Sequence, residues 1–250
     1  MTIWGAVGAF ILGWVCGLLV DYLADLLPAQ SNLAKPMCPA CQAPIHLLSY
    51  LPWRRPCPNC GRKAGLRDWL APALLALAAA WTWLNPPVGM GFLLGLSVLV
   101  YFALVLVIDI EHRLILHITS LAGALIGLAA GFARQGWLVT LVGGLAGLVI
   151  MLAIYFLGGL FGRLLGRLRG RAISEVPFGF GDVLLGTIIG LMVGWPEILR
   201  SLLYTILAAG LFSLVYLAVM LALRRYRLGS AIPYAPFLIL SAIWILYLSA

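Results

Sequence analysis

The 250-residue chain has little charge. Only 10% of its residues are charged, and only 8 of these are acidic. Hydrophobic residues make up 64% of the chain, and the mean hydropathy is +1.08. This balance excludes a soluble domain of this size. The apolar runs are continuous and lack the alternation of a membrane β-barrel, so the sequence predicts an all-α polytopic membrane protein.

Polar sequence is also scarce, because residues 28–68 form the only extended polar segment. The remaining chain divides into stretches near the length of about 20 residues that a bilayer requires. We expect a first transmembrane helix in residues 1–27, a cytoplasmic loop at 28–68 and a seven-helix membrane domain at 69–250. No basic region precedes the first stretch and no small-residue cleavage site follows it, so we expect an anchor rather than a signal peptide. The eight expected transmembrane helices cover residues 3–27, 69–84, 91–108, 114–133, 137–161, 183–198, 201–223 and 231–249.

The 16 basic residues are distributed unevenly. In this topology all but Arg134 and Arg200 lie on the side of the 28–68 loop. Because basic residues flank spans on the cytoplasmic side, this loop is expected in the cytoplasm and both termini outside it. The same bias explains the net charge of +8 without a nucleic-acid partner.

Cysteine is scarce too, with five in the chain, but four of them form two Cys-x2-Cys pairs separated by fifteen residues. Cys38 and Cys41 make the first pair, and Cys57 and Cys60 the second. This spacing predicts a zinc ribbon in which four thiolates enclose a structural Zn²⁺. Reduced thiolates fit a cytosolic loop. His46 is an alternative ligand or an ordinary loop residue, and the fifth cysteine, Cys16, is expected to be a small buried hydrophobe.

Two acids stand at the edges of apolar stretches. A carboxylate near the hydrocarbon core costs about 2.5–3.5 kcal/mol, so it is a candidate functional residue. Asp109 ends the third expected span, and Asp182, in the motif Gly-Phe-Gly-Asp, begins the sixth. The topology places both at the cytoplasmic boundary. If the fold brings them together, two carboxyls that cannot both ionise could hydrolyse a peptide bond; the alternative is that each only caps a helix.

The segments around these acids suggest substrate contact. Gly179 and Gly181 flank Phe180 and are expected to allow an unusual backbone and close approach by a substrate strand. Pro233 and Pro236 lie at the start of the last span. They either leave backbone groups free to bind an extended substrate or simply begin a helix.

Further polar residues near these segments and in the first helix each have two possible roles. Glu111, His112 and His117 follow Asp109 closely, and they either support it or are interface loop residues. Asp21 and Asp25 share one face of the first helix. They either lie at the membrane interface or contact a substrate or cofactor.

Together these motifs resemble those of a known family, the type IV prepilin peptidases or leader peptidases, which are Gly-x-Gly-Asp aspartic proteases of the membrane. The resemblance covers nearly the whole chain. The residues that carry it are Leu48-Ser49-Tyr50-Leu51 between the cysteine pairs, Ile108-Asp109 with Glu111-His112-Arg113-Leu114-Ile115, Gly179-Phe180-Gly181-Asp182-Val183, and Pro236-Phe237-Leu238.

The resemblance implies a reaction. Such enzymes remove the short basic leader of pilin-like or pseudopilin precursors of type IV pilus and type II secretion systems. They cut at the cytoplasmic face of the inner membrane, usually after a glycine. Full-length members often then N-methylate the new amino terminus with S-adenosylmethionine. By resemblance, Asp109 and Asp182 are the catalytic pair, Gly179, Gly181, Glu111 and Pro236 bind substrate or support the site, and Cys38, Cys41, Cys57 and Cys60 bind zinc.

The chain departs from the family pattern at several positions. Leu184 replaces a usual lysine, and His117 a usual proline. In the first helix Asp21 replaces an asparagine and Leu26 an arginine, which bears on methyl transfer; no glycine-rich loop indicates the cofactor independently. Two other functions remain open. One is a membrane-anchored zinc ribbon that recruits a partner for pilus or secretion assembly without catalysis, and the other is a transporter, which the lack of inverted repeats disfavours.

Overall fold

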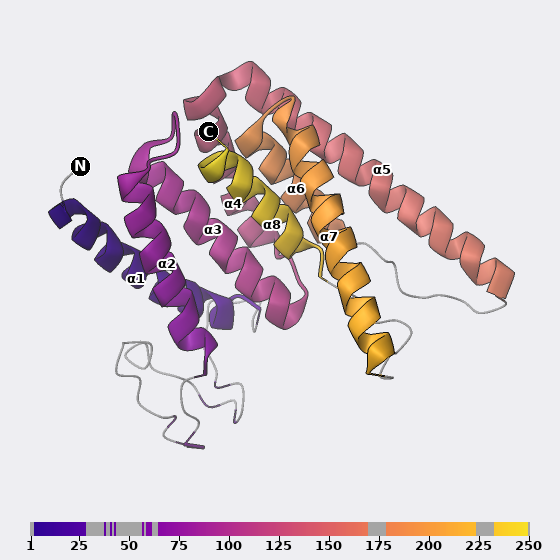
Figure 1. The fold of residues 1–250 in the computed structure, drawn as a ribbon, viewed down its shortest axis with the longest axis horizontal. Helices are drawn as coiled ribbons and strands as arrows, with labels where there is room; N and C mark the ends of the chain where they lie inside the picture. Colours follow the sequence, from indigo (N-terminus) through magenta and orange to yellow (C-terminus); the bar gives the residue numbers. More distant parts are fainter. Residues whose placement is uncertain are drawn as a thin grey trace. The chain divides into compact units, whose positions relative to one another are not determined.

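The computed structural model describes residues 3–28, 38, 41, 43, 57, 59–61, 65–169, 179–223 and 233–249. Every regular element within these ranges is a helix (Figure 1). This confirms the all-α class predicted from the sequence. The chain divides into two compact units, Met1–Thr119 and Ser120–Ala250. The predicted division into an anchor, a cysteine loop and a seven-helix domain stays a prediction.

The first unit contains α1 (Ile3–Leu26), α2 (Arg67–Leu84) and α3 (Gly91–His112). Helices α1 and α2 lie side by side (Figure 1), and small residues of α1 form their contact. A Cβ atom on Gly17 would lie 2.3 Å from the Cα of Pro72, and one on Gly13 would lie 2.5 Å from the backbone oxygen of Leu75. Glycines four residues apart let two membrane helices approach this closely.

The second unit holds the remaining helices. They are α4 (His117–Gln135), which begins just before the unit boundary, α5 (Trp137–Arg169), α6 (Phe180–Val193), α7 (Glu197–Ala222) and α8 (Ala235–Ile243), which continues as a π-helical turn (Trp244–Leu248). A Cβ atom on Gly190 of α6 would lie 2.4 Å from the backbone oxygen of Gly143 on α5, so the two helices approach closely there. The hydroxyl of Ser241 lies 2.9 Å from that of Ser201 and 2.8 Å from that of Thr205, which ties α8 to α7 through buried hydrogen bonds.

Five helical segments of the described chain are long and apolar enough to cross a membrane. They are α1, α3, α4, residues Trp137–Phe161 of α5, and α7. Only 6% of the apolar window of α7 is buried inside the protein, as expected for a helix that faces lipid. Helix α6 and the Ala235–Leu248 segment are apolar but shorter. The structure therefore supports a multi-pass membrane protein with five candidate spans; each of the eight expected spans overlaps a helix, but not all have the length and composition of a crossing.

Candidate catalytic and metal-binding residues

Asp109 lies in the last turn of α3. Its side chain is buried, with the residue 7% exposed. The helix ends three residues later, at His112, because Arg113 takes a left-handed conformation (φ 54°) and its backbone N–H donates to the Asp109 carbonyl at 2.9 Å. Among the described residues, none donates a hydrogen bond to the buried Oδ2 atom of Asp109. A buried carboxylate oxygen without such a donor is costly, and it calls for an explanation such as a catalytic role.

Asp182 lies in the first turn of α6, where Gly179 is the N-cap residue. Its backbone N–H donates to the Gly179 carbonyl at 3.1 Å. The positive end of the helix dipole favours the ionised form of a carboxyl at this position. Gly179 has φ −78° and ψ 143°, an extended conformation open to any residue. The expectation of an unusual backbone is therefore wrong at this glycine. The predicted approach of a substrate strand to Gly179 and Gly181 stays a prediction.

Two tyrosines lie around the Gly-Phe-Gly-Asp segment in the second unit. The ring of Phe180 packs edge-on against that of Tyr155 on α5, with centroids 6.2 Å apart. Tyr234, the N-cap residue of α8, interacts electrostatically with Asp182. Pro236 lies in the first turn of α8, in agreement with the helix-start alternative.

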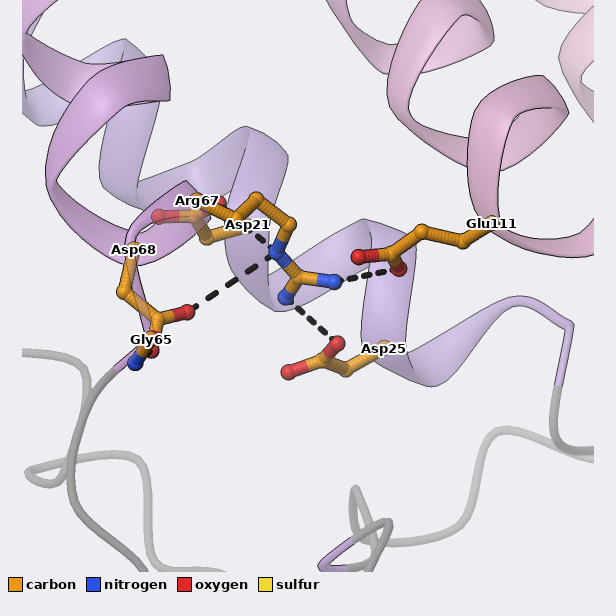
Figure 2. Close-up of polar contacts among 6 residues, drawn as sticks. All are labelled: Asp21, Asp25, Gly65, Arg67, Asp68 and Glu111. Carbon is orange, nitrogen blue, oxygen red and sulfur yellow. Dashed lines mark hydrogen bonds and ion pairs between the residues drawn. The ribbon is translucent and has the colours of Figure 1, made fainter. Parts of the chain in front are cut away.

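The first unit contains a cluster that the sequence did not predict, in which Arg67 contacts four acids (Figure 2). Its Nη1 atom lies 2.5 Å from Oε2 of Glu111, and its Nη2 atom lies 2.6 Å from Oδ1 of Asp25. Its Nε atom lies 3.5 Å from Oδ1 of Asp21 and 3.8 Å from Oδ1 of Asp68. One guanidinium therefore joins the end of α1, the start of α2 and the end of α3.

This cluster assigns roles to residues that had two readings. Asp21 and Asp25 contact Arg67 within the protein, and Asp21 is fully buried. Glu111 is the Arg67 partner in the last turn of α3. His112 ends α3, and His117 begins α4.

The four predicted cysteine ligands converge. Their sulfur atoms all lie within 4.8 Å of one another. The sulfurs of Cys38 and Cys60 are 3.7 Å apart, and so are those of Cys41 and Cys57. Zinc–sulfur bonds of about 2.3 Å in a tetrahedron place two sulfurs about 3.8 Å apart. The geometry therefore fits a tetrahedral ion such as Zn²⁺, and none of the four cysteines is joined in a disulfide.

Local backbone geometry supports this cysteine cluster. The N–H of Gly61 donates to the Cys57 carbonyl at 2.8 Å, and Gly61 has φ +68°, which glycine adopts without strain. Backbone hydrogen bonds from Cys60 and Asn59 lower the pKa of Cys57 to about 6. Such donors favour the thiolate form that metal binding requires. The alternative ligand His46 lies outside the described residues, as does most of the 28–68 loop.

The predicted catalytic aspartates belong to different units, with Asp109 in Met1–Thr119 and Asp182 in Ser120–Ala250. Their pairing stays a prediction. The sequence analysis missed Arg67 and Tyr234 as neighbours of the two motifs. Arg67 is the first residue of α2 and lies at the end of the polar 28–68 segment, so a basic residue expected at the same membrane boundary as Asp21 and Asp25 is the available signal.

Comparison with known proteins identifies a family for this chain. A family model described as the type IV leader peptidase family matches residues 93–217, half of the chain. The matched segment contains Asp109 and Asp182 but not the cysteine loop. No curated protein and no solved structure gives a match. The chain therefore belongs to the type IV leader peptidase family, which is a family of peptidases.

Proposed function

We propose that the protein is a membrane aspartic endopeptidase whose catalytic pair is Asp109 and Asp182. The observation that carries this proposal is the position of the two acids. Both lie in the matched peptidase segment, and both lie in a terminal turn of an apolar helix, the last of α3 and the first of α6.

The order of the helices supports a common membrane face for the two acids. The chain leaves α3 just after Asp109 and enters α6 just before Asp182. Between them lie α4 and α5, each long and apolar enough to cross the membrane once. Two crossings return the chain to the face from which it started. In the proposed topology of eight crossings, this face is cytoplasmic because basic residues flank it.

The proposed chemistry is water activation by two coupled carboxyls. Because two nearby carboxyls cannot both ionise cheaply, one is charged and the other holds a proton. The charged carboxylate takes a proton from water while the water oxygen bonds to the peptide carbon. The protonated carboxyl donates its proton to the carbonyl oxygen. The carboxyl that took the proton from water then gives it to the nitrogen as the C–N bond breaks, while the other carboxylate takes a proton from a hydroxyl of the tetrahedral intermediate. This releases an amine and a carboxylic acid and restores the charged and protonated carboxyl pair. The roles belong to the pair rather than to one residue.

The proposed substrate is a pilin-like or pseudopilin precursor in the inner membrane. This follows from the family resemblance, in which a short basic leader is cut before an apolar helix at the cytoplasmic face. Glu111, Gly179, Gly181 and Pro236 are proposed to support the site or the substrate. Methyl transfer from S-adenosylmethionine stays a prediction from the resemblance. Membrane lipid stays a predicted partner of the protein.

The cysteine cluster is proposed to be structural. Cys38, Cys41, Cys57 and Cys60 would hold Zn²⁺ in a closed shell that leaves no position for a substrate. A bound ion of this kind stabilises a short loop that has too small an apolar core to fold alone.

The test is incubation of the purified protein with a pilin-like precursor, with and without S-adenosylmethionine, followed by mass spectrometry. Loss of the leader mass demonstrates the peptidase, and an added methyl mass demonstrates the transferase. Asp109→Asn and Asp182→Asn should each lower the cleavage rate on the order of 10²–10⁴-fold, because each removes a proton-transfer group.

The matched control is Glu197→Gln, which makes the same acid-to-amide change in the first turn of α7. This variant should cleave like the wild type. Cleavage that persists in either aspartate variant contradicts the proposal. Loss of pilus or secretion assembly without any leader removal would instead favour the zinc-ribbon recruitment module.

A further inference from the structure

We propose that Arg67 is a positioning residue that sets the direction of the Asp109 side chain by holding Glu111. This inference rests on the proposed function of Asp109. It goes beyond that function because it assigns the start of α2, outside the matched peptidase segment, a part in the reaction.

The guanidinium of Arg67 makes its two shortest contacts with acids on different helices. Nη1 contacts Glu111 on α3 at 2.5 Å, and Nη2 contacts Asp25 on α1 at 2.6 Å (Figure 2). A planar guanidinium presents these donors in a fixed fork, so it sets the separation of the two carboxylates as well as their charge. The last turn of α3 is thereby fixed to α1 and α2.

The position of Glu111 relates this contact to Asp109. In an α-helix of 3.6 residues per turn, residues two apart point about 200° apart around the axis. Glu111 is an exposed residue whose carboxylate contacts Arg67, while Asp109 is buried. Holding Glu111 therefore fixes the rotation of the final turn, and with it the direction of Asp109 on the other side of α3.

The start of α2 is itself held in place. The N–H of Gly65 donates to Oδ2 of Asp68 at 2.7 Å, so the acid in the first turn of α2 fixes the backbone that precedes it. Arg67 lies between these two residues. Its guanidinium thus acts from an anchored position rather than from a free loop.

The charge of Arg67 is required as well as its shape. Burial disfavours the charged guanidinium, but the hydrogen bond to Glu111 and the charge of Asp25 outweigh it, and the pKa of Arg67 is raised. Arg67 therefore stays charged at every working pH. A neutral side chain at this position would leave Asp21, Asp25, Asp68 and Glu111 together, and their repulsion would push Glu111 away from α1.

The experiment measures kcat and KM for cleavage of the same pilin-like precursor, per mole of folded protein. The variants are Arg67→Gln, Arg67→Lys, Glu111→Gln and the double variant Arg67→Gln/Glu111→Gln. Folded protein is quantified by thermal unfolding in detergent. The matched control is Arg200→Gln, which removes the exposed Arg200–Glu197 ion pair on α7.

We expect Arg67→Gln to lower kcat about 10- to 100-fold, because a small displacement of a catalytic group has this effect, with KM changed less than about twofold. Arg67→Lys should retain an intermediate kcat, since a point charge replaces the fork. The double variant should resemble Arg67→Gln, and Arg200→Gln should resemble the wild type. If Arg67→Gln does not fold, Arg67→Lys and Glu111→Gln decide the question, and each should show a lowered kcat.

An unchanged kcat per mole of folded protein overturns the proposal, as does a rise in KM alone or losses that multiply in the double variant. Asp109→Asn in the same assay distinguishes failure of the proposed function from failure of the positioning role of Arg67. If Asp109→Asn still cleaves, the proposed function fails. If Asp109→Asn is inactive but the Arg67 variants have a normal kcat, only the positioning role fails.

Discussion

Gly17 lies at a close approach of α1 and α2, and a single methyl group there has no space. A Cβ atom at this position would lie 2.3 Å from the Cα of Pro72, which is backbone and cannot rotate away. Gly8 lies on the same helix with nothing within 4 Å of such an atom. Two glycines of one helix therefore differ in what they tolerate.

We predict that Gly17→Ala destabilises the protein by about 1–3 kcal/mol, because overpacking forces the two helices apart. Thermal unfolding in detergent should show a lowered Tm. Gly8→Ala should leave Tm unchanged or raise it slightly, since alanine favours a helix. Equal Tm values for the two variants would show that α1 and α2 do not pack through Gly17.

Individual residues show where sequence reasoning succeeded and where it did not. The four cysteines were predicted as one cluster because their spacing is a local property of the chain. The role of Arg67 could not be predicted in this way, because its partners Asp25 and Glu111 are 42 and 44 residues away in the sequence. Contacts with them depend on how three helices pack. Gly179 was misjudged because glycine permits an unusual backbone without requiring one.

The cysteine loop is the element whose stability depends most on a ligand. The four sulfur atoms lie within 4.8 Å of one another, so a bound metal ion would fix the positions of the two cysteine pairs. The backbone N–H of Cys38 donates to the Ala43 carbonyl, and that of Gly61 donates to the Cys57 carbonyl, both at 2.8 Å. These hydrogen bonds shape the two Cys-x2-Cys turns.

We predict that the purified protein contains about one zinc ion per chain, measured by mass spectrometry of the metal. Cys57→Ser should abolish this zinc, because a hydroxyl is a poor substitute for a thiolate. Cys16→Ser is the matched control and should keep the zinc, since Cys16 lies on α1 outside the cluster. Full zinc content in Cys57→Ser would exclude the four-cysteine site.

The helices themselves were largely predictable from apolar runs and turn residues. The boundary between α4 and α5 lies at Gly136, with φ 82°, as the sequence indicated. The helix ends were less predictable. Helix α5 continues to Arg169 rather than ending near 161, and α3 continues to His112, because polar residues extend a helix beyond the apolar part that signals it.

At the scale of the whole molecule, the proposed topology places the α3–α4 connection in the cytoplasm and the α2–α3 connection outside. We predict that Leu114→Cys, in a Cys16→Ser background, is not labelled by a membrane-impermeant thiol reagent in spheroplasts, whereas Val88→Cys is labelled. Both positions are exposed, at 51% and 65%. The reverse pattern would invert the topology and move the proposed active site to the other face.

Each of the two units contributes one acid to the proposed catalytic pair. Groups that act as one unit show strongly non-additive losses when they are removed. The decisive measurement is therefore precursor cleavage by Asp109→Asn, Asp182→Asn and the double variant, with Glu197→Gln as control. The account predicts that each single variant loses about as much activity as the double variant. Single losses that multiply in the double variant, or cleavage retained without either acid, would contradict it.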